Sequence, residues 1–352
     1  MLDTENKIQV TSILDSMSIY EKIEFKLIHS DVFKRLANKT QVFDNINGSN
    51  GHKYRTRFSH SLEVGQLSQF ICSALGFNKD LARLFGYMHD IGHAPFGHAG
   101  QDSLNKCMSQ YDDFFEHNHQ AYRSLTVIEN LDLPKEIKFG LLKNKKQTKG
   151  KELEFSNDKN EMPVIECQIC DKADVISYTS GDIEDALNLN IVSLNDLLSH
   201  APFLNNIIDS YNFNNEKDII DNIHSIIMNY FTKNLIKKTK KYLTKNKITT
   251  NLDVINHTQY AVLFSEKVIK ELSLLREFMY KNVYASEERK KERIIQSQAI
   301  EEVFNKIMNN PKDYLPRKYM KRYENGQCTL ARTVCDYVSG CDDKFIFQLK
   351  DN

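Results

Sequence analysis

The stretch His89-Asp90-Ile91-Gly92-His93-Ala94-Pro95-Phe96-Gly97-His98 places three histidines and one aspartate within ten residues. Its adjacent His-Asp pair offers one nitrogen and one oxygen ligand, a set that suits a borderline divalent metal ion. Any one of these histidines alone would more often be a hydrogen-bonded core residue. Together with the upstream cluster Arg57-Phe58-Ser59-His60 and the acidic segment 174–182, the stretch predicts a metal site.

The metal site can be placed on predicted helices. A helix from about Asp80 to Gly92 would set His89 and His93 on one face, with Asp90 about 100° around the axis. A second helix would begin after Arg57. We predict four ligands for the ion: His60, His89, Asp90 and Asp174. They would leave coordination positions open for water and a substrate oxygen, which is typical of a catalytic site.

Apolar residues recur mainly at helical spacing, as in the ranges 19–28, 62–71 and 272–283. Alternating strand patterns are scarce, and breaks rich in glycine, asparagine and proline separate the helical segments. The chain is therefore predicted to be all-α. We expect a metal-dependent catalytic core over residues 1–190 and a C-terminal helical lobe over residues 191–352. The lobe would complete the substrate pocket and an oligomer interface, and the two would pack as one unit.

The composition narrows the class of protein. The chain has 352 residues, 41% of them hydrophobic, which is enough to bury one large core or two fused lobes. We expect a cytoplasmic protein with no membrane partner, because no basic-then-apolar leader and no apolar run of roughly 18 to 20 residues is present. The formal net charge is zero, so the overall charge does not favour a nucleic-acid partner.

The seven cysteines are odd in number and scattered, which favours reduced thiols. Cys167 and Cys170 form a lone CxxC pair, which we interpret as two buried helical cysteines. Three basic runs could contact polyphosphate, although solvated loops or helix faces explain such runs more often: Lys143–Lys151, Lys237–Lys247 and Arg289–Arg293.

A histidine, a His-Asp pair and a distant aspartate are the pattern of the HD phosphohydrolase superfamily. Over nearly its whole length the chain resembles one branch, the deoxynucleoside triphosphate triphosphohydrolases. This branch includes dGTPase-like proteins and is related to the SAM-and-HD-domain dNTPases. The resemblance is carried by ordered blocks: residues 35–43, 55–64, 89–100, 115–123, 166–168, 174–187, 276–284 and 335–345.

The resemblance implies an HD-domain core and hydrolysis of a dNTP to a deoxynucleoside and inorganic triphosphate, with water attacking the α-phosphorus. The four predicted ligands would hold Mn²⁺, Mg²⁺, Fe²⁺ or Co²⁺. Arg57 would clamp phosphate oxygens with its planar donor fork. His93 and His117 match phosphate-contacting positions, and His98 matches the histidine assigned to proton transfer at the 5′-oxygen.

The resemblance also assigns a sugar side. Asp174, Tyr178 and Asp182 follow one another at four-residue spacing and so share a helix face. Tyr178 and Asp182 would contact phosphate or sugar, and Arg276 would contact phosphate. Gln41 would bond the 3′-hydroxyl and Tyr284 would pack near the deoxyribose. The two tyrosines could equally be core residues, and Gln41 could cap a helix. His119 lies outside the motifs and is expected to be structural or on the surface.

The match departs from the family at two places. The family commonly has an acidic residue three positions after His98, where this chain has Gln101 followed by Asp102. We hypothesise that Asp102 substitutes as the group that supports His98, or that turnover is slow. If Asp102→Asn leaves turnover unchanged while Gln101→Glu raises it, the idea that Asp102 takes the place of the family's acidic residue is wrong. Asp44 replaces the family's usual proline, and the loop 45–52 is particular to this chain.

Three functions compete at this stage. The first is the dNTP triphosphohydrolase. The second is an HD phosphohydrolase that acts on another nucleotide. The third is a non-catalytic module that binds nucleotides or single-stranded nucleic acid, which the intact ligand set and the lack of an aromatic stacking platform disfavour. Related enzymes are homo-oligomers and several are nucleotide-activated, so we expect a homo-oligomer with dNTP activation.

Overall fold

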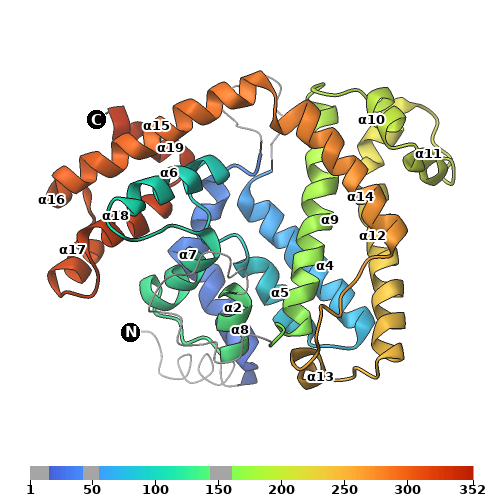
Figure 1. Cartoon of the computed structure of the whole chain (residues 1–352), viewed down its shortest axis with the longest axis horizontal. Coiled ribbons are helices and arrows are strands. Elements are labelled where there is room, and N and C mark those ends of the chain that lie inside the picture. The colour runs from blue at the N-terminus through green and yellow to red at the C-terminus, as the bar shows by residue number, and fades with distance from the viewer. Residues whose placement is uncertain (1–15, 43–54, 143–160, 352) are drawn as a thin grey trace, which may run out of the picture.

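Short polar side chains begin the helices that carry the predicted ligands. The structure is a computed structural model that describes residues 16–42, 55–142 and 161–351 (Figure 1). The hydroxyl of Thr56 accepts from the backbone N–H of Ser59 at the start of α4 (Arg57–Leu75). The side chain of Asn78 caps α5 (Lys79–Met88) in the same way. Such caps satisfy backbone donors that the first helical turn leaves unpaired.

Helices α4 and α5 form an antiparallel pair whose backbones come unusually close. A side chain at Gly86 would lie 2.4 Å from the Cα of Gly65, so glycine at this crossing allows the contact. The prediction that the helix reaches Gly92 is wrong, because α5 ends at Met88. Gly92 lies instead in an irregular turn that follows α5. It packs against the backbone of His117, where any Cβ would clash.

The long helix α9 (Ile165–Asn188) is the centre of the fold. It packs against α4, α5, α12 (Glu216–Lys245) and α14 (Glu266–Met279). Helix α15 (Glu287–Asn309) crosses the molecule at the top of Figure 1 and contacts α6 (His98–Ser109), α18 (Leu330–Ser339) and α19 (Asp343–Asp351).

Shorter helices complete the described chain: α2 (Ile19–His29), α3 (Asp31–Lys34), η1 (Arg35–Asn38), α7 (His117–Arg123), η3 (Ser124–Ile128), α8 (Lys135–Leu142), α10 (Leu194–His200), α11 (Phe203–Ile208), α13 (Asn251–Ile255), η5 (Tyr280–Tyr284), α16 (Pro311–Tyr314) and α17 (Arg317–Glu324). Over the described residues the only β-type pairing is one bridge between Thr40 and Thr56. The all-α prediction is confirmed. None of the described helices has the length and apolar composition needed to cross a bilayer.

The apolar side chains form two cores. The larger core joins residues from Ile23 to Val283, and the smaller joins α6 with the helices from α15 onward. The boundary predicted near residue 190 stays a prediction. Cys167 and Cys170 are buried on α9, as expected, and neither forms a disulfide within the described residues.

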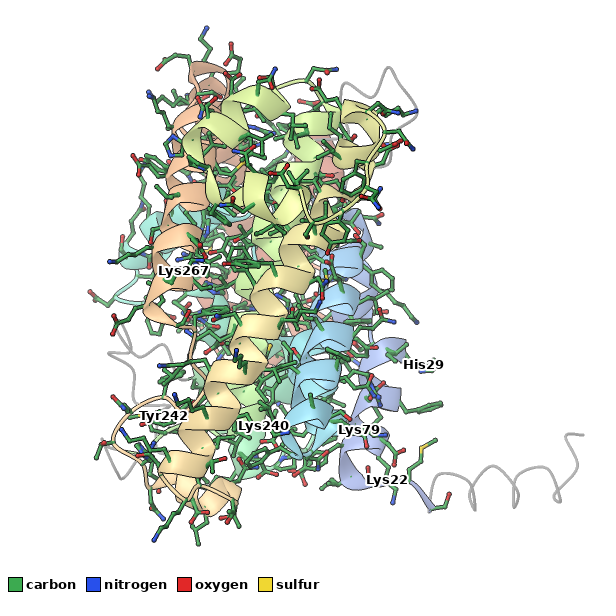
Figure 2. All side chains as sticks on the ribbon, turned by 90° about the vertical axis from the view of Figure 1, so that its right-hand side faces the viewer. Lys22, His29, Lys79, Lys240, Tyr242 and Lys267 are labelled. Carbon is green, nitrogen blue, oxygen red and sulfur yellow. The ribbon has the colours of Figure 1, made fainter. Side chains whose placement is uncertain are left out.

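The three basic runs lie in different surroundings. Lysines of the run 237–247 are exposed along α12, and Figure 2 shows Lys240 on that outer face. The run 143–151 lies outside the described residues, as do Asp44 and the loop 45–52. The third run, Arg289–Arg293, lies in the first turns of α15.

Candidate active site

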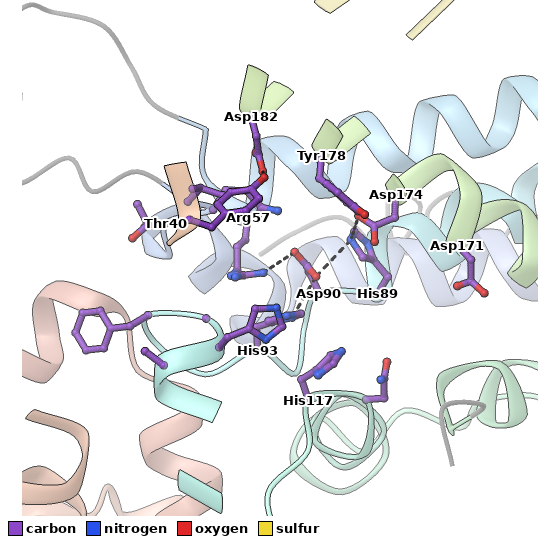
Figure 3. Close-up of a pocket in the computed structure, with 18 of the residues that line it drawn as sticks. Thr40, Arg57, His89, Asp90, His93, His117, Asp171, Asp174, Tyr178 and Asp182 are labelled. Carbon is purple, nitrogen blue, oxygen red and sulfur yellow. Dashed lines mark hydrogen bonds and ion pairs between the residues drawn. The ribbon is translucent and has the colours of Figure 1, made fainter. Parts of the chain in front are cut away.

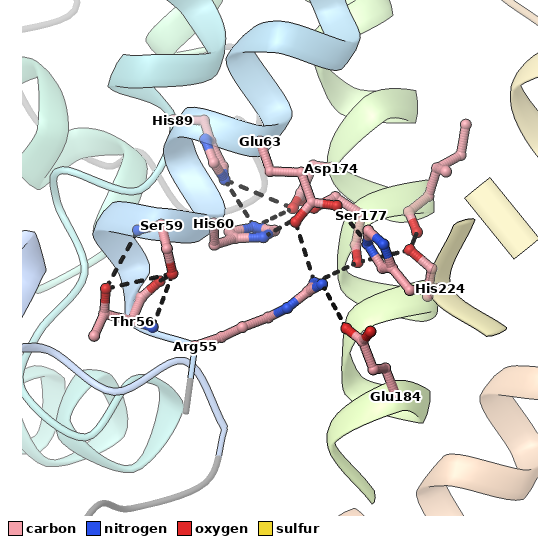
Figure 4. Close-up of polar contacts among 12 residues, drawn as sticks. Arg55, Thr56, Ser59, His60, Glu63, His89, Asp174, Ser177, Glu184 and His224 are labelled. Atoms are coloured by element: carbon pink, nitrogen blue, oxygen red, sulfur yellow. Dashed lines mark hydrogen bonds and ion pairs between the residues drawn. The ribbon is translucent and has the colours of Figure 1, made fainter. Parts of the chain in front are cut away.

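Three of the four predicted metal ligands lie together. His60 comes from α4, His89 directly follows α5 and Asp174 comes from α9. One ligand atom of each lies within 4.8 Å of the others (Figures 3 and 4). Asp174 Oδ1 is 2.9 Å from Nε2 of His60 and 3.6 Å from Nε2 of His89. The two Nε2 atoms are 3.3 Å apart. A nitrogen, a second nitrogen and a carboxylate oxygen therefore converge on one point.

Hydrogen bonds on the far side of each ring set this orientation. Nδ1 of His89 lies 2.7 Å from the carbonyl oxygen of Gly86, which can only accept, so Nδ1 carries a proton and, in the neutral ring, Nε2 has the lone pair. Nδ1 of His60 pairs with the hydroxyl of Ser177 at 3.2 Å. Outer partners of this kind orient imidazole ligands for a metal ion.

The electrostatics of the cluster favour a cation. Burial lowers the pKa of His89, but Asp90 and Asp174 outweigh it and raise that pKa to about 9. Burial opposes ionisation of Asp174, yet its contacts with His60 and His89 hold its pKa below the usual range. The donor set, two imidazoles and a carboxylate, fits a divalent ion.

Asp90, the fourth predicted ligand, lies at the edge of the cluster. Its Oδ1 is 3.4 Å from Nε2 of His89 and 3.1 Å from Nδ1 of His93. Its Oδ2 accepts a hydrogen bond from Arg57 at 2.9 Å (Figure 3). Asp90 therefore links the ligand cluster to Arg57 and His93.

A cavity of about 570 Å³ opens beside the cluster. It lies between the two cores, with walls from α4, α5 and α9 on one side and α6 and α15 on the other. Most predicted site residues line it: Gln41, Arg57, His89, Asp90, His93, His98, His117, Asp174, Tyr178, Asp182 and Tyr284. His60 lies behind this wall and is buried. Asp102 and Arg276 do not line it, and the guanidinium carbon of Arg276 lies 5.6 Å from the ring centre of Tyr178.

Tyr284 and Asp182 form a buried polar pair on the cavity wall. The tyrosine hydroxyl donates to Oδ2 of Asp182 at 2.5 Å. Burial raises the pKa of Asp182 to about 6, against the hydrogen bond from Tyr284. Tyr178 and Tyr284 both line the cavity, and Tyr284 also packs against the larger core.

Gln41 caps no helix among the described residues. Its side-chain oxygen is buried and has no hydrogen-bond partner among the described residues, and Gln41 lines the cavity. An unpaired buried acceptor is costly unless a ligand satisfies it. His119, expected to be structural or on the surface, has a buried ring that packs at a tilt against Phe114, with centroids 4.9 Å apart.

Three histidines form a row along the cavity. The rings of His93 and His117 are 4.4 Å apart, and those of His93 and His98 are 6.2 Å apart. Burial and the charge of Arg57 lower the pKa of His98, and Asp102 opposes the shift. Asp102 is exposed and forms no hydrogen bond with His98 in the described part of the chain. Its supporting role stays a prediction.

Helix α15 supplies a wall that the sequence interpretation missed. Arg289, Glu292, Arg293 and Gln296 recur at i, i+3, i+4 and i+7, so one helix face lines the cavity. Arg289 is paired with Glu292 at 2.7 Å. The basic run was noticeable in the sequence, but a charged helix surface gave no sign that it faces the ligand cluster.

A polar network supports the cluster from behind (Figure 4). Arg55 contacts Glu63 and Glu184 at 3.2 Å each and donates to the carbonyl of Ser177 at 3.4 Å. Glu63 also pairs with His224 of α12 at 2.6 Å. The network therefore connects α12 to the segment of α9 whose Ser177 bonds to His60.

The chain is similar to known proteins over most of its length. The HD domain family matches residues 57–179, and the phosphohydrolase-associated domain matches residues 262–352. A deoxyguanosinetriphosphate triphosphohydrolase-like protein of Rickettsia peacockii is 31% identical over 94% of this chain and 89% of its own length. A protein of the same description from Leptospira interrogans is 33% identical over 93% of this chain and 87% of its own length. The crystal structure of a hypothetical protein from Aquifex aeolicus is 16% identical in sequence to this chain. The match spans 90% of this chain and 70% of the other, with a TM-score of 0.35.

Proposed function

Because the chain belongs to the HD-domain family of deoxyguanosinetriphosphate triphosphohydrolase-like proteins, we propose that it hydrolyses deoxynucleoside triphosphates. This membership confirms the resemblance noted in the sequence. The products would be a deoxynucleoside and inorganic triphosphate, formed by attack of water at the α-phosphorus. The names of the relatives make dGTP the first substrate to test.

One observation carries the proposal most directly. Nε2 of His60, Nε2 of His89 and Oδ1 of Asp174 converge at the wall of a cavity large enough for a nucleotide. With Asp90 they would hold Mn²⁺, Mg²⁺, Fe²⁺ or Co²⁺. A divalent ion held there would lower the pKa of a nearby water and offset charge on the α-phosphate.

The remaining residues have roles that fit their positions. Arg57 would bind phosphate oxygens, since its Nε is buried and has no partner among the described residues. His98 would supply the proton that the leaving 5′-oxygen takes. His93 and His117 would lie beside the α-phosphate. The negative charge of the substrate would counter the effect of Arg57, which lowers the pKa of His98.

The sugar would lie against Gln41, Asp182 and Tyr284. The unpaired oxygen of Gln41 could accept from the 3′-hydroxyl, and the Tyr284–Asp182 pair would limit the space near C2′. Arg276 would act through Tyr178, on which it rests. Homo-oligomer formation and activation by a dNTP stay predictions.

Product analysis tests this function. The protein is incubated with each dNTP, singly and mixed, plus Mn²⁺ or Mg²⁺, and the products are separated by chromatography. We expect deoxynucleoside and triphosphate from wild type and from His29→Ala, a control at an exposed histidine. His89→Ala and Asp174→Asn should yield neither product. Mono- or diphosphates would indicate an HD phosphohydrolase with another substrate, and metal binding without turnover would indicate a nucleotide-binding module.

A further inference from the structure

Gln101 contacts His117 rather than His98. Its Oε1 lies 2.7 Å from Nδ1 of His117 and 3.1 Å from the backbone nitrogen of the same residue. A backbone N–H can only donate, so the Gln101 atom that faces it must be the oxygen. That oxygen is also an acceptor for the ring, and Nδ1 of His117 therefore carries a proton.

A second acceptor supports the same tautomer. Oε1 of Glu116 lies 3.0 Å from Nδ1 of His117. The neutral ring then has its lone pair on Nε2, on the side away from Gln101, and His117 lines the cavity. A neutral Nε2 cannot donate to a phosphate oxygen, but it can accept from water.

We propose that Gln101 is a positioning residue that holds His117 as its Nδ1–H tautomer, so that Nε2 accepts a hydrogen bond from the attacking water. The tautomer stands on its own geometry, and the role toward water rests on the proposed function.

The charges around His117 explain why an amide matters at this position. Glu116, which caps α7, and Asp90 favour the protonated form of His117. His98 on α6 and Arg57 on α4 oppose it. His93 packs on the ring. Burial is the largest effect, and the pKa of His117 is lowered. Gln101 orients the ring without adding the negative charge that would stabilise its protonated form.

The tautomer can be measured directly. Nitrogen-15 NMR of histidine-labelled holoprotein with Mg²⁺, with His117 assigned through His117→Ala, distinguishes the two ring nitrogens. We expect a protonated Nδ1 and a bare Nε2 in wild type. Gln101→Met keeps the side-chain length but removes the acceptor, and should give a changed tautomer ratio. Gln66→Glu, at an exposed position on α4, should match wild type. An unchanged ratio in Gln101→Met overturns the proposal.

The pH profile tests the role in turnover. Gln101→Glu should raise the pKa of His117 and move the acidic limb of kcat toward higher pH. Gln101→Met should lower kcat about tenfold or more with little change in KM, an effect of the size given by general base positioning. If wild type hydrolyses dNTPs and neither variant shifts kcat or its pH profile, His117 is not the acceptor. If wild type hydrolyses no dNTP, the proposed function fails, while the NMR result still decides the tautomer.

Discussion

The carboxylate of Asp343 accepts a hydrogen bond of 2.9 Å from the backbone N–H of Phe96, which lies 247 positions earlier in the chain. The same carboxylate accepts from the backbone N–H of Thr40 at 2.9 Å and from its hydroxyl. Phe96 has a φ of +60°, a conformation that is uncommon for a residue with a side chain. Both Phe96 and Thr40 line the cavity, so Asp343 of α19 holds two residues of the cavity wall in place.

Replacing Asp343 with alanine should therefore affect stability and activity together. The two half-buried backbone donors would lose their partner, and leaving a buried donor unpaired costs about 1–3 kcal/mol. We expect a lower free energy of unfolding in urea and a lower kcat/KM for dNTP hydrolysis. Asp351→Ala, at an exposed position on the same helix, is the control. Equal stability of the two variants would contradict this account.

Ser177 should affect metal affinity without touching the ion. Ser177→Ala removes the hydroxyl that orients His60, and loss of such an outer partner typically costs about 10- to 100-fold in metal affinity. Titration calorimetry with Mn²⁺ measures the change. Ser180→Ala is a matched control, since Ser180 is a buried serine of the same helix that bonds only to helix carbonyls. Equal affinities in the two variants would mean that Ser177 does not orient His60.

Arg293 should contribute to substrate binding. It lines the cavity and has no ion-pair partner among the described residues, whereas Arg57 and Arg289 are paired with carboxylates. Arg293→Met should raise KM for a dNTP roughly tenfold, from the loss of about 1.5–3 kcal/mol of charged hydrogen bonding. Lys291→Met removes the same charge from an exposed position of α15 outside the cavity and should leave KM unchanged. Parallel changes in both variants would point to a general charge effect.

Asp182 should make stability depend on pH. Its pKa is about 6 in the folded protein and about 3.9 in an unfolded chain, so the folded state binds the proton more tightly. Its stabilising contribution is complete below about pH 4 and is lost as the pH rises through 6. A difference of this size corresponds to about 3 kcal/mol.

The comparison with Asp182→Asn isolates this effect, because the other titrating groups are common to both proteins. Unfolding free energies measured between pH 4 and 7 should show wild type losing stability relative to the variant. Tyr284→Phe removes the hydrogen bond that lowers the pKa and should move the transition to higher pH. A difference that stays constant over this range would contradict the prediction.

Much of the candidate site could be predicted from the sequence because several of its residues follow local rules. Asp174, Tyr178 and Asp182 share a face of α9 since helical periodicity is a property of neighbouring residues. The same rule failed for His93. Gly92 must pass close to the backbone of His117, and that distant contact ends α5 before His89.

The sequence by itself determined the all-α class, the residue types of the His-His-Asp cluster and the family, because periodicity and motif spacing are properties of short stretches of chain. Only the tertiary structure decided that α15 lines the cavity, that Gln101 bonds to His117 and that Asp343 supports Phe96. Each of these contacts joins segments that meet when helices pack. No local pattern specifies which distant partner a buried polar group will find.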